Sequence, residues 1–438
     1  MVCSASADRC LLQSHSALSG ALTHHRSTES CCGFLLLLPV PVPVPSPQTP
    51  AALRARVHGA GPSGALAALA LARAGWQVQL CDPLSPAQLS VRSRAYALTH
   101  SSRELLEQLQ LWQPLQPALA PFQRLELCDR ALSRQLTFSS DDLPTAHRTG
   151  AAGDAVGWIL QHPPLMAVLL QALQAEPAIQ LQLGRPVPAA AVLSAADRFD
   201  LLVAADGHAS PSRRAAGLRR WGFAYRQGCL TVQVRLRGGV PEQAWELFRP
   251  EGPFAVLPLG GDAYQLVWSA PLPRLQQLER LDGAAFLDAL SAALPEALQA
   301  EVLLDQPRAF AVAWELAWPL RRRRLVLLGE AAHRCHPVGG QGLNLCWRDV
   351  AALATLARRC AEGRFRAADL PGRYARRRGL DVIAVLLATD ALVRLFSNRQ
   401  PLLLPLRRMA LALLAALPPL RRLVLGAMTD GPLRLLRP

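Results

Sequence analysis

The stretch RARVHGAGPSGALAALALARAGWQVQLCD, residues 54–82, decides the fold of this chain. Its first five residues alternate in polarity and predict a short β-strand. Residues 65–74 are small and apolar and predict a helix, and residues 76–81 predict a second strand. A strand, a glycine-rich turn, a helix and a second strand in this order predict the first half of a dinucleotide-binding α/β fold.

The glycine turn in this stretch has the spacing GxGxxG, in which each glycine has its own physical task. Gly59 permits the tight turn, Gly61 lets the backbone approach a pyrophosphate, and Gly64 lets the helix pack closely on the strand. Asp82 ends the second strand 23 positions after Gly59, near the offset at which an acid meets ribose hydroxyls. The alternative is a structural turn, which the accompanying strands, helix and acid make the weaker interpretation.

A second motif follows another apolar stretch, RFDLLVAA at 198–205, which predicts a buried strand. Asp206 and Gly207 stand at the end of this strand, where the ligand-binding loops of open α/β sheets lie. The pair therefore indicates a second part of the same site. Because Asp-Gly is also a common turn dipeptide, a purely structural turn is the alternative.

A third buried strand, RLVLL at 324–328, runs into a Gly-Glu pair whose acid is Glu330, and a glycine-rich turn then precedes a helix at 343–360. Such a turn directs several backbone N–H groups and a helix N-terminus toward one point, which suits a ligand carrying negative charge. The residues singled out in this turn are Pro337, Gly339, Gly340, Gly342 and Asn344. His333 and His336 make a metal site an alternative, but no matching ligand pattern accompanies them, so we predict no metal and structural histidines.

Between the second and third motifs, residues 222–270 change character. The runs TVQVRL, FAVLPL and YQLVWS are short, rich in β-formers and separated by glycines, which predicts an antiparallel sheet. The fold class expected is α/β, with a Rossmann-like nucleotide-binding domain, an inserted antiparallel substrate domain and a helical C-terminal tail. The predicted boundaries are 1–50 for a disordered extension, 51–119, 157–221 and 316–370 for the nucleotide domain, 120–156 and 222–315 for the substrate domain, and 371–438 for the helical region.

The composition excludes several kinds of chemistry. The 438 residues contain 47 basic side chains, all of them arginine, so there is neither a Walker A lysine nor a Schiff-base lysine. The ten cysteines form no CxxC pair and match no zinc pattern, which is typical of reduced thiols in a cytoplasmic protein. The first 50 residues, with their run PVPVPVPSPQTP, predict an extended and disordered segment.

The C-terminal fifth of the chain is both basic and apolar. Residues 351–438 hold sixteen arginines against five acids, although the whole chain has a net charge of only +15. Residues 402–425 are rich in leucine and contain the pairs Arg407-Arg408 and Arg421-Arg422, which predicts an interfacial helix pair with guanidinium groups at lipid phosphates. The alternative is a helical hairpin that covers the nucleotide domain. Because aromatic residues are not interleaved with the arginines, we predict no nucleic-acid partner.

Taken together, the three motifs resemble those of the single-component FAD-dependent aromatic monooxygenases. A closer resemblance, over residues 55–430, is to the UbiH/UbiF-type hydroxylases of quinone biosynthesis. It is carried by RAYAL at 94–98, LQLW at 109–112, GWIL at 157–160 and TDALVRLFSN at 389–398. The chain departs from that family in having Glu330 where aspartate is usual and Asp82 where glutamate is commoner, so we expect the ribityl and ribose contacts to be adjusted.

The resemblance implies a role for each motif. Gly59, Gly61, Gly64 and Asp82 would bind the ADP half of FAD. Asp206 and Gly207 would lie near the cofactor and the path of the nicotinamide donor, and Glu330 would hold the ribityl chain. Gly339, Gly340, Gly342 and Asn344 would lie by the isoalloxazine ring, with Arg94 and Gln161 near the cofactor. No individual catalytic side chain is predicted beyond the flavin-facing turn at Pro337, Gly339 and Gly340.

The activity implied is the hydroxylation of the aromatic ring of a prenylated phenol by NAD(P)H and O2 through a flavin hydroperoxide. The alternatives are an FAD-dependent prenyl-lipid reductase or cyclase, and a non-catalytic flavoprotein subunit of a membrane biosynthetic complex. The location expected is cytoplasmic, with peripheral contact to a membrane surface through the C-terminal tail.

Overall fold

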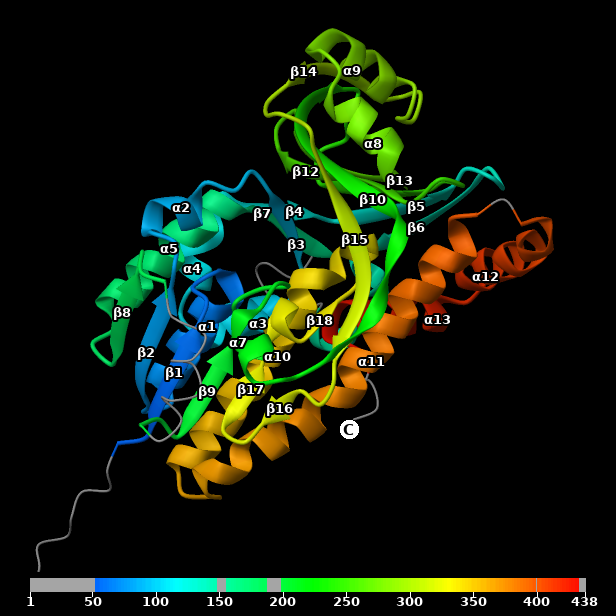
Figure 1. Cartoon of the computed structure of the whole chain (residues 1–438). Helices are drawn as coiled ribbons and strands as arrows, with labels where there is room; N and C mark the ends of the chain where they lie inside the picture. Colours follow the sequence, from blue (N-terminus) through cyan, green and yellow to red (C-terminus); the bar gives the residue numbers. More distant parts are fainter. Residues whose placement is uncertain (1–51, 148–154, 187–197, 399, 433–438) are drawn as a thin grey trace, which may run out of the picture. The chain divides into compact units, whose positions relative to one another are not determined.

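A parallel sheet organises the part of the chain that carries the first motif (Figure 1). The structure, a computed structural model, describes residues 52–147, 155–186, 198–398 and 400–432. The sheet has the strand order β16-β17-β9-β1-β2-β8 and is parallel except at β16. Its strands are β1 (Arg54–His58), β2 (Gln77–Asp82), β8 (Ile179–Leu183), β9 (Leu201–Ala204), β16 (Arg321–Arg322) and β17 (Leu325–Leu327).

Helices cover this sheet because its central strands are apolar on both faces. Every residue of β9 and β17 is buried, as expected for a parallel sheet that has helices on both sides. Helix α1 (Pro62–Arg73) consists largely of alanine and leucine, and it packs against α10 (Gln341–Ala361) and α5 (His162–Ala175). The remaining helices of the described N-terminal half are α2 (Pro86–Ser90), α3 (His100–Gln108), α4 (Trp112–Leu115) and α7 (Pro211–Ala215).

The second and larger sheet is mainly antiparallel, which confirms the expectation for residues 222–270. Its order is β18-β15-β10-β13-β12-β11-β5-β6, with β14 paired to β10. One pairing that the sequence patterns did not predict is parallel, between β11 and β5. The strands are β5 (Arg124–Asp129), β6 (Arg134–Ser139), β10 (Arg220–Arg237), β11 (Gln243–Phe248), β12 (Phe254–Gly260), β13 (Ala263–Pro271), β14 (Gln299–Leu303), β15 (Arg308–Ala317) and β18 (His333–Arg334).

A small third sheet packs against β12 of the larger sheet. It has the order β3-β7-β4, with β3 (Ala95–Leu98), β4 (Leu119–Phe122) and β7 (Gly157–Gln161). Helices α8 (Leu272–Glu279) and α9 (Gly283–Ser291) lie against the larger sheet, where Phe286 and Leu290 are fully buried. The predicted domain boundaries stay a prediction, since residues 51–438 form one compact unit. The predicted disordered extension, 1–50, lies outside the described residues.

Three helices form the C-terminal region: α11 (Leu370–Phe396), α12 (Leu404–Ala416) and α13 (Pro418–Asp430). Within the described residues, no single helix is long and apolar enough to cross a membrane. The segments 401–416 and 418–430 pass that test only as a pair, and they are bent by 103°. The helix pair predicted from the leucine-rich tail is therefore present, and it is sharply bent.

Two of the four paired arginines in this tail correct a prediction. Arg407 is 1% exposed and donates hydrogen bonds to the carbonyls of Leu395 and Asn398, at the end of α11. The Arg421 guanidinium donates to Asp142 at 2.8 Å. Neither group is placed to bind lipid phosphates, because each stabilises the attachment of the helix pair to the rest of the chain.

Candidate cofactor site

The three sequence motifs meet at the carboxyl ends of adjacent parallel strands. Gly59 follows β1, Asp206 follows β9 and Gly329 follows β17, and these three strands are neighbours in the sheet. The motifs are also close in space, because a Cβ atom on Gly59 would lie 2.3 Å from the carbonyl oxygen of Ala205. The carboxyl edge of an open α/β sheet is where such folds bind their ligands.

The glycine turn has the geometry expected for a pyrophosphate site. A Cβ on Gly64 would lie 1.9 Å from the Gly59 carbonyl oxygen, so only glycine permits this approach of α1 to the turn. At Gly61, the N-cap of α1, an added Cβ would meet nothing within 4 Å. The helix has neither a side-chain cap nor an acid in its first turn, so its N-terminal N–H groups face open space and an anion is favoured there.

Asp82 has a structural role at this edge of the sheet, in addition to the contact with ribose hydroxyls that is predicted for it. Its two carboxylate oxygens accept hydrogen bonds from the backbone N–H groups of Ala60, at 2.6 Å, and Leu84, at 2.8 Å. The acid at the end of β2 therefore fixes the shape of the glycine turn. Its predicted contact with ribose hydroxyls stays a prediction, and lone pairs that these two bonds leave unused would have to supply it.

The second motif, at Asp206 and Gly207, supports the third, at Gly329 and Glu330, through hydrogen bonds. The Asp206 carboxylate accepts hydrogen bonds from the Ser210 hydroxyl and from the backbone N–H of Ser212, and so holds the start of α7. From this helix Arg213, which is 4% exposed, donates to the carbonyl oxygen of Ala331 at 2.9 Å. Through Ser210 and Arg213, Asp206 therefore supports the Gly-Glu turn. The predicted positions of Asp206 and Gly207 near the cofactor stay predictions.

A buried carboxylate that the sequence patterns did not reveal supports that turn from behind. Asp349, on α10, accepts hydrogen bonds from the Gly329 backbone N–H at 2.9 Å, from His333 Nε2 at 2.7 Å and from Arg378 Nε at 2.6 Å. Burial raises the pKa of Asp349, but the charges and hydrogen bonds of His333 and Arg378 outweigh burial and lower it to about 2. His333 is thus engaged by a carboxylate, in agreement with its predicted structural role, while the Glu330 side chain is exposed.

The predicted flavin-facing turn forms a left-handed loop at the N-terminus of α10. Gly339 and Gly340 have φ values of 65° and 63°, which favour glycine at both positions. Asn344 is fully buried and makes five hydrogen bonds, to Ala97, Thr99, Ser102 and Gly340. Its amide is therefore used to hold the turn against β3, and any contact of Asn344 with a flavin would have to come from its backbone.

The predicted residues Arg94 and Gln161 lie at the same end of the small sheet, where β3 begins and its neighbour β7 ends. Arg94 directly precedes β3, and its guanidinium lies 5.3 Å from the centre of the Phe310 ring. Gln161 is the N-cap of α5 and pairs with Ala95 across β7 and β3. The small sheet itself lies against the predicted flavin-facing turn, since a Cβ on Gly340 would be 3.0 Å from the Ala97 Cβ.

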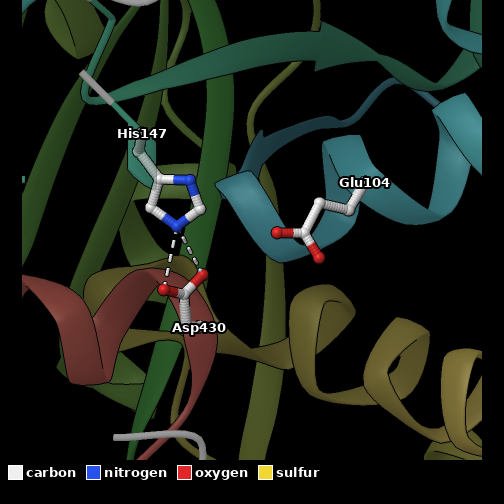
Figure 2. Close-up of side chains that lie close together, drawn as sticks. All are labelled: Glu104, His147 and Asp430. Atoms are coloured by element: carbon white, nitrogen blue, oxygen red, sulfur yellow. Dashed lines mark hydrogen bonds and ion pairs between the residues drawn. The ribbon is translucent and has the colours of Figure 1, made fainter. Parts of the chain in front are cut away.

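The last helix, α13, contacts the residues near the predicted flavin-facing turn. The Gln341 amide donates to the carbonyl oxygen of Met428 at 3.1 Å, and the Ser101 hydroxyl donates to that of Thr429 at 2.8 Å. At the end of α13, His147 Nε2 lies 2.9 Å from both carboxylate oxygens of Asp430 (Figure 2). These contacts connect the bent helix pair to the helix that begins at the predicted flavin-facing turn.

Figure 2 also shows Glu104 beside this pair. One ligand-type atom each from Glu104, His147 and Asp430 lies within 4.8 Å of the others. All three side chains are partly exposed, and His147 and Asp430 already bond to each other. The interaction that this cluster displays is therefore a hydrogen bond between His147 and Asp430, which attaches α13 to the segment after β6.

Comparison with known proteins gives a consistent picture. A family profile described as an FAD binding domain matches residues 197–378. The chain is 30% identical to the 3-demethoxyubiquinol 3-hydroxylase of Escherichia coli, over 82% of this chain and 93% of that enzyme. It is also 30% identical to an uncharacterized protein of Synechocystis, over 85% of this chain and 92% of the relative. The p-nitrophenol 4-monooxygenase of Pseudomonas putida shares the fold, with a TM-score of 0.67 at 16% identity over 87% of this chain and 98% of that enzyme.

Proposed function

This chain belongs to the family of FAD-dependent hydroxylases of quinone biosynthesis, and on that premise we propose that it hydroxylates the aromatic ring of a polyprenylated phenol. It is an FAD-dependent monooxygenase, for which NAD(P)H is the reductant typical of the family. The observation that carries the proposal is the meeting of the three motifs at the carboxyl ends of β1, β9 and β17.

The residues at this edge fit FAD. The open space beside Gly61 and the uncapped N-terminus of α1 suit the pyrophosphate, and the exposed carboxylate of Glu330 suits the ribityl hydroxyls. The N-terminus of α10 after Gly340 presents backbone N–H groups to negative charge. Bound FAD supplies the redox chemistry between NAD(P)H, O2 and the phenol, and the protein binds and orients the two rings and excludes water.

The test uses protein that carries FAD, a short prenylphenol and ¹⁸O2. We expect faster anaerobic bleaching of the flavin by NAD(P)H when the phenol is present, and one ¹⁸O atom in the hydroxylated product. Flavin that is reduced without oxygen transfer would favour a reductase or cyclase. Flavin that is never reduced would favour a non-catalytic subunit, and protein that cannot bind FAD would contradict the enzyme assignment.

We also propose that the bent pair α12–α13 contacts a membrane surface, where a polyprenylated substrate resides. Its exposed apolar side chains support this proposal: Leu402, Leu406, Met409, Leu413, Leu417 and Leu423 are between 43% and 87% exposed. Arg408 and Arg422 are also exposed and can reach lipid phosphates, whereas Arg407 and Arg421 are engaged within the chain.

Binding to vesicles of anionic and zwitterionic lipids tests this contact. We expect the double variant Met409→Asp, Leu413→Asp to remain in the supernatant when wild-type protein sediments with anionic vesicles. The matched control is Leu380→Asp, because Leu380 is 68% exposed but lies on α11. Equal sedimentation of the double variant and the wild type would contradict the proposed surface.

A further inference from the structure

Strand β11 carries a carboxylate in an apolar setting. All six residues of β11 are buried, and Glu246 among them is 7% exposed. Across the sheet Glu246 pairs with Ala255 on β12 and Leu127 on β5, neither of which can neutralise its charge. Taking a carboxylate out of water is costly unless ion pairs or hydrogen bonds compensate it, so an acid at this position requires an explanation.

The other buried acids of the described chain have partners that compensate their charge. Each is held by an arginine or by two backbone N–H groups: Asp82, Asp129, Asp142, Asp349 and Asp381. Glu246, by contrast, makes no ion pair with any described residue. Glu246 is thus a buried carboxylate with spare capacity to accept a proton.

The cavity that Glu246 lines places this acid beside the predicted flavin-facing turn. Glu246 lines a small cavity of about 10 Å³ together with Ser269 of the larger sheet and with Pro337 and Val338 of that turn. Pro253, Ala255 and Val267 complete the lining. The carboxylate therefore lies between the larger sheet and the turn, where a phenol ring must meet a flavin ring if the proposed function holds.

Burial is the main influence on the pKa of Glu246. Burial raises the pKa of Glu246 to about 7, against a smaller lowering by the Gly339 hydrogen bond. Among its neighbours the Cys229 thiol interacts with both Glu246 and Arg94, and burial raises the pKa of that thiol to about 12, so it stays protonated. On β5, Glu126 and Cys128 bond to each other, and β12 carries no titratable residue. A base is most effective when its pKa lies near the working pH.

We propose that the Glu246 carboxylate is the general base that accepts the phenolic proton of the substrate, an inference that rests on the proposed function. The phenol O–H bond breaks, its electron pair stays on the phenol oxygen and the proton moves to a carboxylate oxygen of Glu246. The phenolate oxygen then donates electron density to the ring, which makes the ring carbon a better nucleophile toward the incoming oxygen. Because this step is a proton transfer alone, it requires neither an oxidant nor a reductant.

The experiment compares Glu246→Gln with wild-type protein, both carrying FAD, on 2-prenylphenol. Glutamine keeps the shape and an oxygen acceptor for Gly339 but cannot accept the proton. We expect kcat at neutral pH to fall by about 100-fold to 10,000-fold, with little change in KM or in the flavin spectrum. We also expect wild-type kcat to rise as the pH passes through about 7, and this inflection to be absent from the variant.

Glu126→Gln is the matched control, because Glu126 is a carboxylate in the adjacent strand that does not line the cavity. Its kcat and pH profile should match those of the wild type. A readout independent of turnover is the infrared band of a protonated carboxyl group, which should be present in wild-type protein at about pH 6, where ordinary carboxylates are ionised, disappear as the pH passes through about 7, and be absent from Glu246→Gln at about pH 6.

Two kinds of failure are distinguishable. If the wild type transfers oxygen to 2-prenylphenol, but Glu246→Gln retains the same kcat and pH profile, the proposed base is wrong and the proposed function stands. If the wild type binds FAD but transfers no oxygen to any prenylphenol, the proposed function fails and this inference falls with it. A carboxyl band that titrates well below pH 7 would also overturn the proposed base.

Discussion

Replacing Asp349 by asparagine removes a charge from the centre of a buried network and should destabilise the protein strongly. The carboxylate is 1% exposed and accepts three hydrogen bonds, two of them from the ring of His333 and the guanidinium of Arg378. A pKa lowered from 3.8 to about 2 corresponds to about 2 kcal/mol of stabilisation of the folded protein. Because Arg378 keeps a second carboxylate partner in Asp381, the expected loss stays at about 2 kcal/mol.

The pH dependence of this contribution has a definite sign. Because folding lowers the pKa of Asp349, its contribution to the free energy of unfolding is complete above about pH 4 and is lost as the pH falls toward about 2. The wild-type melting temperature should therefore decline over that range, and the difference between the wild type and Asp349→Asn should shrink.

Thermal unfolding of the FAD-free proteins, followed by circular dichroism, measures this difference. The control is Glu107→Gln, which removes an exposed i,i+4 ion pair with Arg103 and should cost at most about 0.5 kcal/mol. A melting temperature of Asp349→Asn equal to that of the control would refute the reasoning. So would a difference from the wild type that does not shrink in acid.

Three further outcomes are expected. Gly61→Ala should leave the melting temperature of the FAD-free protein unchanged, because the added Cβ meets nothing within 4 Å, but it should weaken FAD binding about tenfold or more in a flavin fluorescence titration. Asn344→Ala should lower the free energy of unfolding by about 2–4 kcal/mol, since five hydrogen bonds are lost in a fully buried site, and chemical denaturation would show this. Arg408→Ser with Arg422→Ser should weaken binding to anionic vesicles by about 1 kcal/mol per arginine without changing the melting temperature, and unchanged vesicle binding would contradict the proposed membrane contact.

The sequence patterns predicted the parts of the site that are local in the chain. A buried strand followed at once by a glycine turn is a short-range signal, and it marked the ends of β1, β9 and β17 correctly. Spacing could not reveal contacts between distant segments. Asp349 supports Gly329 through a hydrogen bond across 20 positions, and Arg421 bonds to Asp142 across 279 positions.

The same limitation explains the error at Arg407 and the omission of Glu246. An arginine between leucines is normally exposed, and only the packing of α12 against the end of α11 shows that Arg407 is buried. The run QAWELF at 243–248 has no periodicity that distinguishes its acid from a solvent-facing one. Glu246 is buried because β11 pairs with β5 and β12. Of these two strands, β5 lies more than 100 positions before β11 in the chain.

The attachment of α13 to the flavin-facing turn affects how this protein should be handled in the laboratory. Shortening the chain before α12 would be an obvious way to remove the apolar leucines that promote aggregation. The truncation would also remove the carbonyl acceptors of Gln341 and Ser101 and leave the buried Asp142 without its arginine. A shortened protein would therefore be expected to lose its yellow colour, so detergent is a better means of solubilisation than deletion.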